Sequence, residues 1–208
     1  MFEMTKVRQH LAAPLTVFFV AFFLAACATP KVEPSGFLTT YETLNASDES
    51  GAVRLRTSSA EVLASYKSVI IDMPTMVEAR LKPAEATAIR ASLADALGLE
   101  LARERVIGTE AAAGTLRVRY AIVRVDTSNV ALNALTTTVI GPVAYGSLAL
   151  EVEVLDSLSG ERLAAMTWAR GAKAGNVLGA YSPTGNARAL APDFAKRVAR
   201  LISPDMPA

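Results

Sequence analysis

The sequence contains one histidine and one cysteine, and both lie close to the N-terminus. His10 precedes an apolar run and Cys27 follows it, so cleavage just before Cys27 would remove the imidazole and leave the thiol at the new terminus. This scarcity excludes Ser-His-Asp and Cys-His catalysis, ordinary zinc and copper sites, and disulfide bonds in the mature chain. We therefore expect no catalytic residues, no metal and no cofactor, although carboxylate chemistry, lysine chemistry and oxygen-ligated Ca²⁺ or Mg²⁺ remain open.

Aromatic residues and excess charge are also scarce. Phenylalanine, tryptophan and tyrosine make up 6% of the chain, and most of the phenylalanines precede residue 27. An aromatic platform that stacks bases or sugars is therefore hard to build in the mature chain. The formal net charge is +1, and loss of residues 1–26 would remove two positive charges and one negative charge. This neutral balance argues against a nucleic-acid partner.

An export signal is present at the N-terminus. Lys6 and Arg8 precede an uncharged run over residues 11–26, which is the pattern of a signal peptide. The run is shorter than the roughly 20 apolar residues that a membrane-spanning helix needs. We therefore expect cleavage of the signal, with a retained membrane anchor as the alternative.

The stretch Leu24-Ala25-Ala26-Cys27 resembles the lipobox of bacterial lipoproteins. The resemblance implies a diacylglycerol on the Cys27 sulfur, cleavage before Cys27 and acylation of the new N-terminus, so that acyl chains such as palmitate hold the protein on a membrane. An ordinary secreted protein is the alternative, because Ala26-Cys27-Ala28 also fits a signal-peptidase site. Residue 28 is not aspartate, which by resemblance to enterobacterial sorting favours the outer membrane, facing the periplasm.

Composition and spacing divide the chain into a signal, a tether and one domain. Residues 1–26 are the signal peptide, and residues 27–34 are the lipidated N-terminus with a short proline-containing tether. Residues 35–204 have the length and patterning of a single domain, and residues 205–208 are a tail.

The apolar pattern of the domain predicts an α+β fold. Ile89, Leu93, Leu97 and Leu101 recur every four residues, which indicates one face of a long helix, and three later segments alternate as strands do. The predicted elements are a strand over 68–73, a helix over 82–106, strands over 116–126, 148–155 and 161–171, and a helix over 189–202. We expect an antiparallel sheet of about four to five strands, with the long helix and the C-terminal helix packed on one face.

Three stretches, in this order behind the lipobox, resemble one protein family. They are SGFLTTYETL, GTLRVRYAIVRVD and GSLALEVEVLDSLSGERLAAMTWARG. They are similar to a family of bacterial lipoproteins known as domain of unknown function 3313, and the similarity covers roughly residues 35–202. The resemblance implies one folded unit and lipoprotein status. It implies no catalytic residue, because the family has no established activity to carry over.

Charged residues on two predicted strands are the first candidate site. Arg117 and Arg119 share one face of their strand, and Glu151 and Glu153 share one face of theirs. If these strands are antiparallel neighbours, the four residues form cross-strand ion pairs on the solvent face. The alternative is a groove that binds an anion between the two arginines.

Three further groups of residues are weaker candidates. Asp156, Ser157, Ser159 and Gly160 faintly resemble a calcium loop, but the spacing fits a capped hairpin turn better. The glycine-rich segment over 171–186, with Gly171, Gly175 and Gly179, is expected to be a mobile loop, and the alternative is a loop that gates a binding cleft with Tyr181 and Asn186. A carboxylate pair for glycoside hydrolysis would have to come from Asp72, Asp95, Asp126 and Asp156.

Residues 130–146 form an apolar stretch that is broken by Asn133, Gly141 and Pro142. It is either an irregular bridge on the core or an exposed loop that binds a partner. Taken together, these features predict a non-catalytic lipoprotein that is held on the membrane through Cys27 and binds an envelope protein or component. The alternatives are a carboxylate-based envelope hydrolase and a small-molecule binding lipoprotein.

Overall fold

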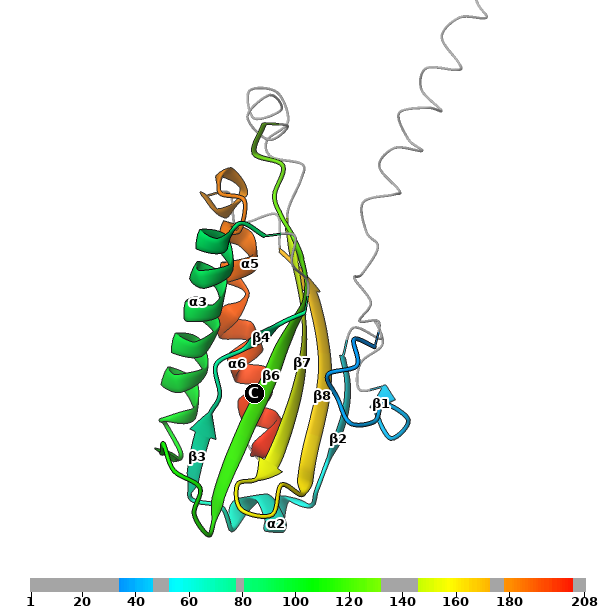
Figure 1. The fold of residues 1–208 in the computed structure, drawn as a ribbon, viewed down its shortest axis with the longest axis vertical. Helices are drawn as coiled ribbons and strands as arrows, with labels where there is room; N and C mark the ends of the chain where they lie inside the picture. The colour runs from blue at the N-terminus through cyan, green and yellow to red at the C-terminus, as the bar shows by residue number, and fades with distance from the viewer. Residues whose placement is uncertain (1–33, 47–52, 78–80, 132–145, 173–177, 204–208) are drawn as a thin grey trace, which may run out of the picture.

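Three long antiparallel strands form the centre of a sheet: β6 (Thr115–Asp126), β7 (Ser147–Asp156) and β8 (Arg162–Gly171). These strands confirm the alternation in the sequence, and a short turn joins β7 to β8 as the hairpin prediction requires. The computed structural model describes residues 34–46, 53–77, 81–131, 146–172 and 178–203. The arrangement is shown in Figure 1.

Five shorter strands extend the sheet on both sides. The order is β1-β2-β8-β7-β6-β3-β5, with β4 pairing with β6 outside this path. The short strands are β1 (Asn45–Ala46), β2 (Val53–Thr57), β3 (Ser68–Ile71), β4 (Thr75–Met76) and β5 (Val106–Ile107). The expected α+β fold is therefore confirmed, but the sheet has eight strands in the described residues, and the expectation of four to five was wrong.

The sheet is mixed, and the prediction that it is antiparallel holds only for part of it. β3 runs parallel to both β5 and β6, and β4 runs parallel to β6. The reason is the long helix between β3 and β6, because a helical crossover returns the chain to its starting end and so makes the next strand parallel.

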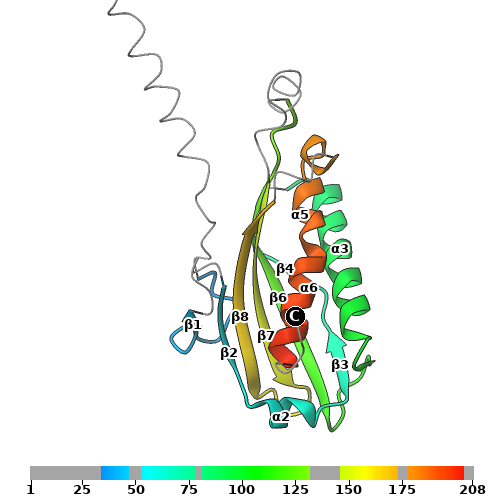
Figure 2. The ribbon, with the colours of Figure 1, turned by 180° about the vertical axis from the view of Figure 1, so that it is seen from behind.

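The helices α3 (Pro83–Leu101), α5 (Gly185–Ala189) and α6 (Ala191–Ile202) cover one face of the sheet, as Figures 1 and 2 show from opposite sides. Two shorter elements are α2 (Ala60–Ala64) and the 3-10 turn η2 (Leu178–Tyr181). This one-sided helical layer confirms the prediction. None of the helices in the described residues is long and apolar enough to span a membrane.

The two predicted helices are shorter than expected. α3 begins at Pro83 but ends at Leu101, because the chain must turn before Val106 and Ile107 pair with β3. The C-terminal helix α6 begins at Ala191, two residues later than predicted, because Ala189 ends the preceding short helix α5.

The main core lies between the helices and the sheet. The α3 stripe of Ile89, Leu93, Leu97 and Leu101 is buried as predicted. From α6, the Phe194 ring reaches the sheet, with its centroid 5.8 Å from that of Tyr120 and 5.7 Å from that of Trp168. The helices do not cover the opposite face of the sheet, which contacts a different segment of the chain.

Candidate functional site

The face of the sheet turned away from the helices carries the candidate site. Alternate residues of β7 and β8 point to this side, among them Glu151, Glu153 and Ala165. Residues 34–44, which we call the strap, lie on this face (Figure 2). They contribute to the burial of its part over β7 and β8, where Glu151, Glu153 and Ala165 lie. Leu38 and Leu44 of the strap pack on Ala165, so the strap is part of the folded domain and continues into β1.

Glu151 fastens the beginning of the strap. Its carboxylate accepts hydrogen bonds from the Ser35 amide at 3.1 Å, from the Ser35 hydroxyl at 2.6 Å and from the Tyr41 hydroxyl at 2.8 Å. The Tyr41 oxygen in turn accepts a hydrogen bond from the Gly36 amide at 2.9 Å. Gly36 has φ +84°, a backbone conformation that favours glycine and lets the strap turn here.

Glu153 fastens the middle of the strap and is only 1% exposed. It accepts hydrogen bonds from the Thr39 amide at 2.8 Å and from the Thr39 hydroxyl at 3.0 Å. Guanidinium nitrogens of Arg162 and Arg119 lie 3.7 Å and 3.9 Å from its oxygens. The buried charge is therefore compensated, as a buried carboxylate requires.

The two glutamates were predicted to lie in solvent, and this prediction was wrong. Their alternation along β7 was interpreted correctly, but the strap covers the face to which they point. Hydroxyl and amide donors from the strap replace the water that exposed carboxylates would bind. Of the expected cross-strand ion pairs, Arg119 with Glu153 is confirmed.

Arg117 does not pair with a glutamate. It lies opposite Leu155 in the sheet, and its Nε donates to the Asp72 carboxylate at 3.0 Å and 3.1 Å. Glu151 lies opposite Ala121. Arg119 also lies over the Phe37 ring of the strap, with its guanidinium carbon 5.4 Å from the ring centroid.

Arg117, Arg119 and the β7–β8 turn line an open groove of about 350 Å³. In the turn, Asp156 accepts hydrogen bonds from the amides of Leu158 at 2.9 Å and Ser159 at 2.8 Å. Gly160 has φ +72°. These contacts confirm the capped hairpin turn over the calcium loop, and the described residues hold no cluster of three acidic, histidine or cysteine side chains suited to a metal ion.

Tyr66, two residues before β3, donates a hydrogen bond from its hydroxyl to the Asp156 carboxylate of this turn at 2.9 Å. The Ser159 amide and then the Tyr66 hydroxyl lower the pKa of Asp156. Burial, followed by the Asp156 hydrogen bond, raises the pKa of Tyr66. The hydrogen bond between the two side chains contributes to both shifts, because it favours the ionised carboxylate and the protonated phenol.

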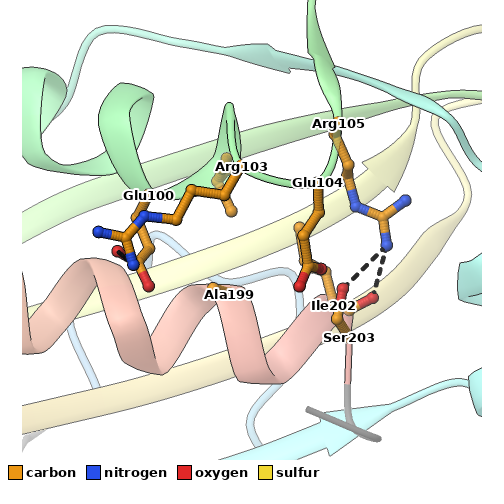
Figure 3. Close-up of a pocket in the computed structure, with 8 residues that line it drawn as sticks. Glu100, Arg103, Glu104, Arg105, Ala199, Ile202 and Ser203 are labelled. Carbon is orange, nitrogen blue, oxygen red and sulfur yellow. Dashed lines mark hydrogen bonds and ion pairs between the residues drawn. The ribbon is translucent and has the colours of Figure 1, made fainter.

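A second cavity of about 170 Å³ lies between the end of α3 and the end of α6 (Figure 3). Arg105 occupies its edge and donates to the Ile202 carbonyl at 2.8 Å and to the Ser203 hydroxyl at 3.2 Å, beside the C-terminus of α6. Desolvation by burial lowers the pKa of Arg105. A cation at the end of a helix is a stabilising cap, and the cavity is smaller than the roughly 300–1,000 Å³ of typical ligand pockets.

Three of the four aspartates proposed for hydrolysis have separate partners. Asp72 pairs with Arg117, Asp156 caps the hairpin turn, and Asp126 contacts Arg124 at 3.7 Å and accepts a hydrogen bond from Ser147. Asp95 lies on α3. These contacts give the first three carboxylates structural roles.

The remaining candidates lie partly outside the described residues. Most of the apolar stretch 130–146 and residues 173–177 of the glycine-rich loop belong to those parts, as does Cys27. In the described part of the loop, Tyr181 is partly exposed, whereas Asn186 is buried and its amide donates to the Ser128 hydroxyl at 3.3 Å. Asn186 therefore contributes to packing and does not line a cleft.

From the sequence, the strap is identified only as the first of the three stretches that resemble the family, SGFLTTYETL. The available signal was the concentration of hydroxyl side chains around Phe37 and Leu38, opposite a strand that places glutamates at alternate positions. Sequence alone does not say which buried carboxylate such donors meet.

A family model for a protein of unknown function, DUF3313, matches residues 33–198. The match covers well over half of the chain, so the protein belongs to this family. No curated protein matches the sequence.

Several solved structures are similar in three dimensions. A PelC dodecamer from Paraburkholderia phytofirmans has 12% identity and a TM-score of 0.48, covering 74% of this chain and 98% of that one. A hypothetical protein from Chlamydia trachomatis has 12% identity and a TM-score of 0.44, covering 67% and 99%. A DUF4136 family protein from Bacteroides thetaiotaomicron has 9% identity and a TM-score of 0.38, covering 73% and 96%.

Proposed function

We propose that this member of the DUF3313 family is a lipid-anchored, non-enzymatic module of the outer membrane that faces the periplasm and binds an envelope protein or component. Lipid on Cys27 would supply the membrane attachment. The observation that carries the proposal is the position of the strap. It starts seven residues after Cys27 and is fixed to the domain by two buried glutamates.

A strap that is bonded to the domain keeps the domain close to a lipid anchor at residue 27. The acyl chains hold only residue 27, so the domain stays near the membrane through the chain that follows. With the strap fixed by Glu151 and Glu153, only residues 28–33 separate Cys27 from the strap. A domain held this closely is suited to meeting partners at the membrane surface.

The contacts of the carboxylates favour binding over hydrolysis. A general acid or base must reach a proton on its substrate. Glu151 and Glu153 instead bond to the strap and are buried beneath it, while Asp72, Asp126 and Asp156 have structural partners. The groove beside Arg117 is open, which suits a surface contact better than an enclosed small molecule.

The first test is lipidation in a bacterial host. Cells grown with labelled palmitate should yield a labelled protein, and a Cys27→Ser variant should lose the label while it still folds. Intact mass should place the mature N-terminus at Cys27 with the added acyl mass. An unlabelled mature chain that begins at Thr29 would contradict the anchor.

The second test addresses membrane and partner. Density separation should place the lipidated protein in the outer-membrane fraction, and crosslinking in intact cells should recover a reproducible envelope partner. Recovery only in the inner-membrane fraction would contradict the location. A protein that hydrolyses envelope glycans at a rate abolished by Asp72→Asn would contradict the non-enzymatic role.

A further inference from the structure

We propose that the strap-bearing face of the sheet lies against the phosphate headgroups of the membrane that holds the lipid, with Arg117, Arg119 and Leu158 at the contact. This orientation rests on the proposed lipid anchor at Cys27. Beyond that anchor, the inference specifies which face of the domain contacts the membrane and which residues make the contact. The helical layer then points away from the bilayer, toward the periplasm.

The length of the tether limits the possible orientations. Cys27 and Ser35 are eight residues apart, so a fully extended chain between them spans at most about 26–29 Å. Ser35 is bonded to Glu151 of β7, in the strap-bearing face. A membrane that holds Cys27 therefore lies within this distance of that face.

If the helices faced the membrane instead, the chain between Cys27 and Ser35 would have to be almost fully extended. To reach the nearer side edge of the sheet from β7, the chain would have to pass β8, β2 and the short edge strand β1, which are successive neighbours at a spacing of about 4.8 Å. It would then pass the helix layer, whose axes lie roughly 10 Å behind the sheet and whose outer surface lies about 5 Å farther. If the strap-bearing face lies against the membrane, the chain does not have to pass around the sheet, because Ser35 is already on that face.

The charges exposed on this face suit phosphate. The Arg119 side chain is 44% exposed while its partner Glu153 is 1% exposed, and the Arg117 side chain is 47% exposed against 26% for Asp72. In both pairs the guanidinium lies nearer the solvent than the carboxylate. An approaching anionic surface therefore meets the arginines first.

An apolar side chain stands beside these arginines. Leu158, at the tip of the β7–β8 turn, is 63% exposed and lines the same groove as Arg117 and Arg119. Cationic groups next to an exposed apolar residue are typical of surfaces that rest in the headgroup region. Asp156 lines the same groove, and Glu42 and Glu161 are exposed nearby on the strap and the turn, so the arginines orient the domain while the lipid supplies the attachment.

The test uses a pair of exposed leucines on opposite sides of the domain. Leu158 lies on the proposed contact, and Leu99 on α3 is 74% exposed. Because lipid blocks the sulfur of Cys27, Leu158→Cys and Leu99→Cys each give the full-length lipoprotein one reactive thiol for a fluorophore. The labelled proteins are reconstituted in vesicles that contain phosphatidylglycerol and headgroup-labelled acceptor lipid.

Energy transfer should place the label at residue 158 nearer the headgroups than the label at residue 99, by at least about 10 Å, the separation of the two layers. Equal distances, or a shorter distance for residue 99, would overturn the orientation. Intact mass of the same sample reports the lipid separately. Absence of lipid contradicts the proposed function, whereas a lipidated protein with the wrong order of distances contradicts only this inference.

A charge variant tests the arginine contact. Arg117→Gln with Arg119→Gln should lose most of the distance difference in phosphatidylglycerol vesicles, while Arg103→Gln, a matched change on the helical side, should keep it. Urea unfolding and circular dichroism establish that each variant is folded. An unchanged difference in the folded double variant would overturn the arginine contact.

Discussion

At the scale of single residues, Glu153 is the clearest case of a charge held inside the domain. Its carboxylate contacts Thr39 and two arginines beneath the strap. Glu153→Gln keeps the size of the side chain but removes the charge that these donors compensate. We expect unfolding in urea to show a loss of about 1.5–3 kcal/mol, the usual value of a hydrogen bond to a charged group.

The matched control is Glu110→Gln, because Glu110 lies exposed before β6. That change should alter the free energy of unfolding by less than about 0.5 kcal/mol. An equal loss in the free energy of unfolding for the two variants would mean that the contacts between Glu153 and the strap do not contribute to stability.

Asp156 gives a prediction for acidic pH. The Ser159 amide and the Tyr66 hydroxyl lower its pKa in the folded protein, so folding is favoured by its ionised form. This contribution is complete above the ordinary aspartate pKa of about 3.9 and is lost as the pH falls through the lower folded value. Asp156→Asn should therefore be less stable than the parent at pH 7, with the difference shrinking below about pH 4.

Urea unfolding of both proteins between pH 3 and 7 measures this dependence. Asp95→Asn, a change of the same chemistry on α3, provides the comparison. A difference between the parent and Asp156→Asn that stays constant over this range would contradict the role assigned to the carboxylate.

The sequence shows which residues share a face of a strand. It does not show which segment of the chain covers that face. The alternation in β7 correctly separates Leu150 and Val152 from Glu151 and Glu153. A charged residue in such a pattern is ordinarily solvated, so the buried glutamates were missed. Their burial depends on donors in a strap more than 100 residues earlier in the chain.

At the scale of elements, α6 joins the helical layer to the sheet mainly through Phe194. The ring is fully buried and contacts Tyr120 of β6 and Trp168 of β8. Phe194→Ala removes these contacts and leaves a cavity, so it should cost about 3–5 kcal/mol in urea unfolding. Lys196→Ala, on the exposed side of the same helix, should change stability by less than about 0.5 kcal/mol.

A small loss for Phe194→Ala would show that the helix does not depend on this ring. Thermal unfolding gives an independent reading, because a large loss in stability must also lower the Tm. The comparison with Lys196→Ala separates loss of packing from a change in helix propensity.

Elements with a long repeating pattern were predicted well, and short ones were not. α3 and the three central strands carry several repeats of their period, which sequence alone reveals. β1, β4 and β5 have two residues each, too few to show a period. The parallel pairing of β3 depends on the crossover through α3, which the element order contained but the antiparallel interpretation overlooked.

At the scale of the whole molecule, the central strand β7 is covered on both faces. The helices pack against one side and the strap against the other, so residues 147–154 are buried throughout. The domain therefore has a third, thin layer that a prediction of helices on one face did not include. This layer is also the part of the domain nearest to Cys27 along the chain.

Hydrogen exchange distinguishes a strap that folds with the domain from one that belongs to the tether. The amides of Ser35 and Thr39 bond to the buried carboxylates, so we expect them to exchange slowly, together with β7. Exposed residues 109–111 should exchange quickly. In Glu153→Gln, protection should fall at Thr39 while β7 stays protected, because the amide oxygen of glutamine is a weaker acceptor than the carboxylate whereas the strand keeps its partners. Fast exchange of the Thr39 amide in the parent, at the rate of residues 109–111, would place the boundary of the folded domain after the strap and lengthen the tether accordingly.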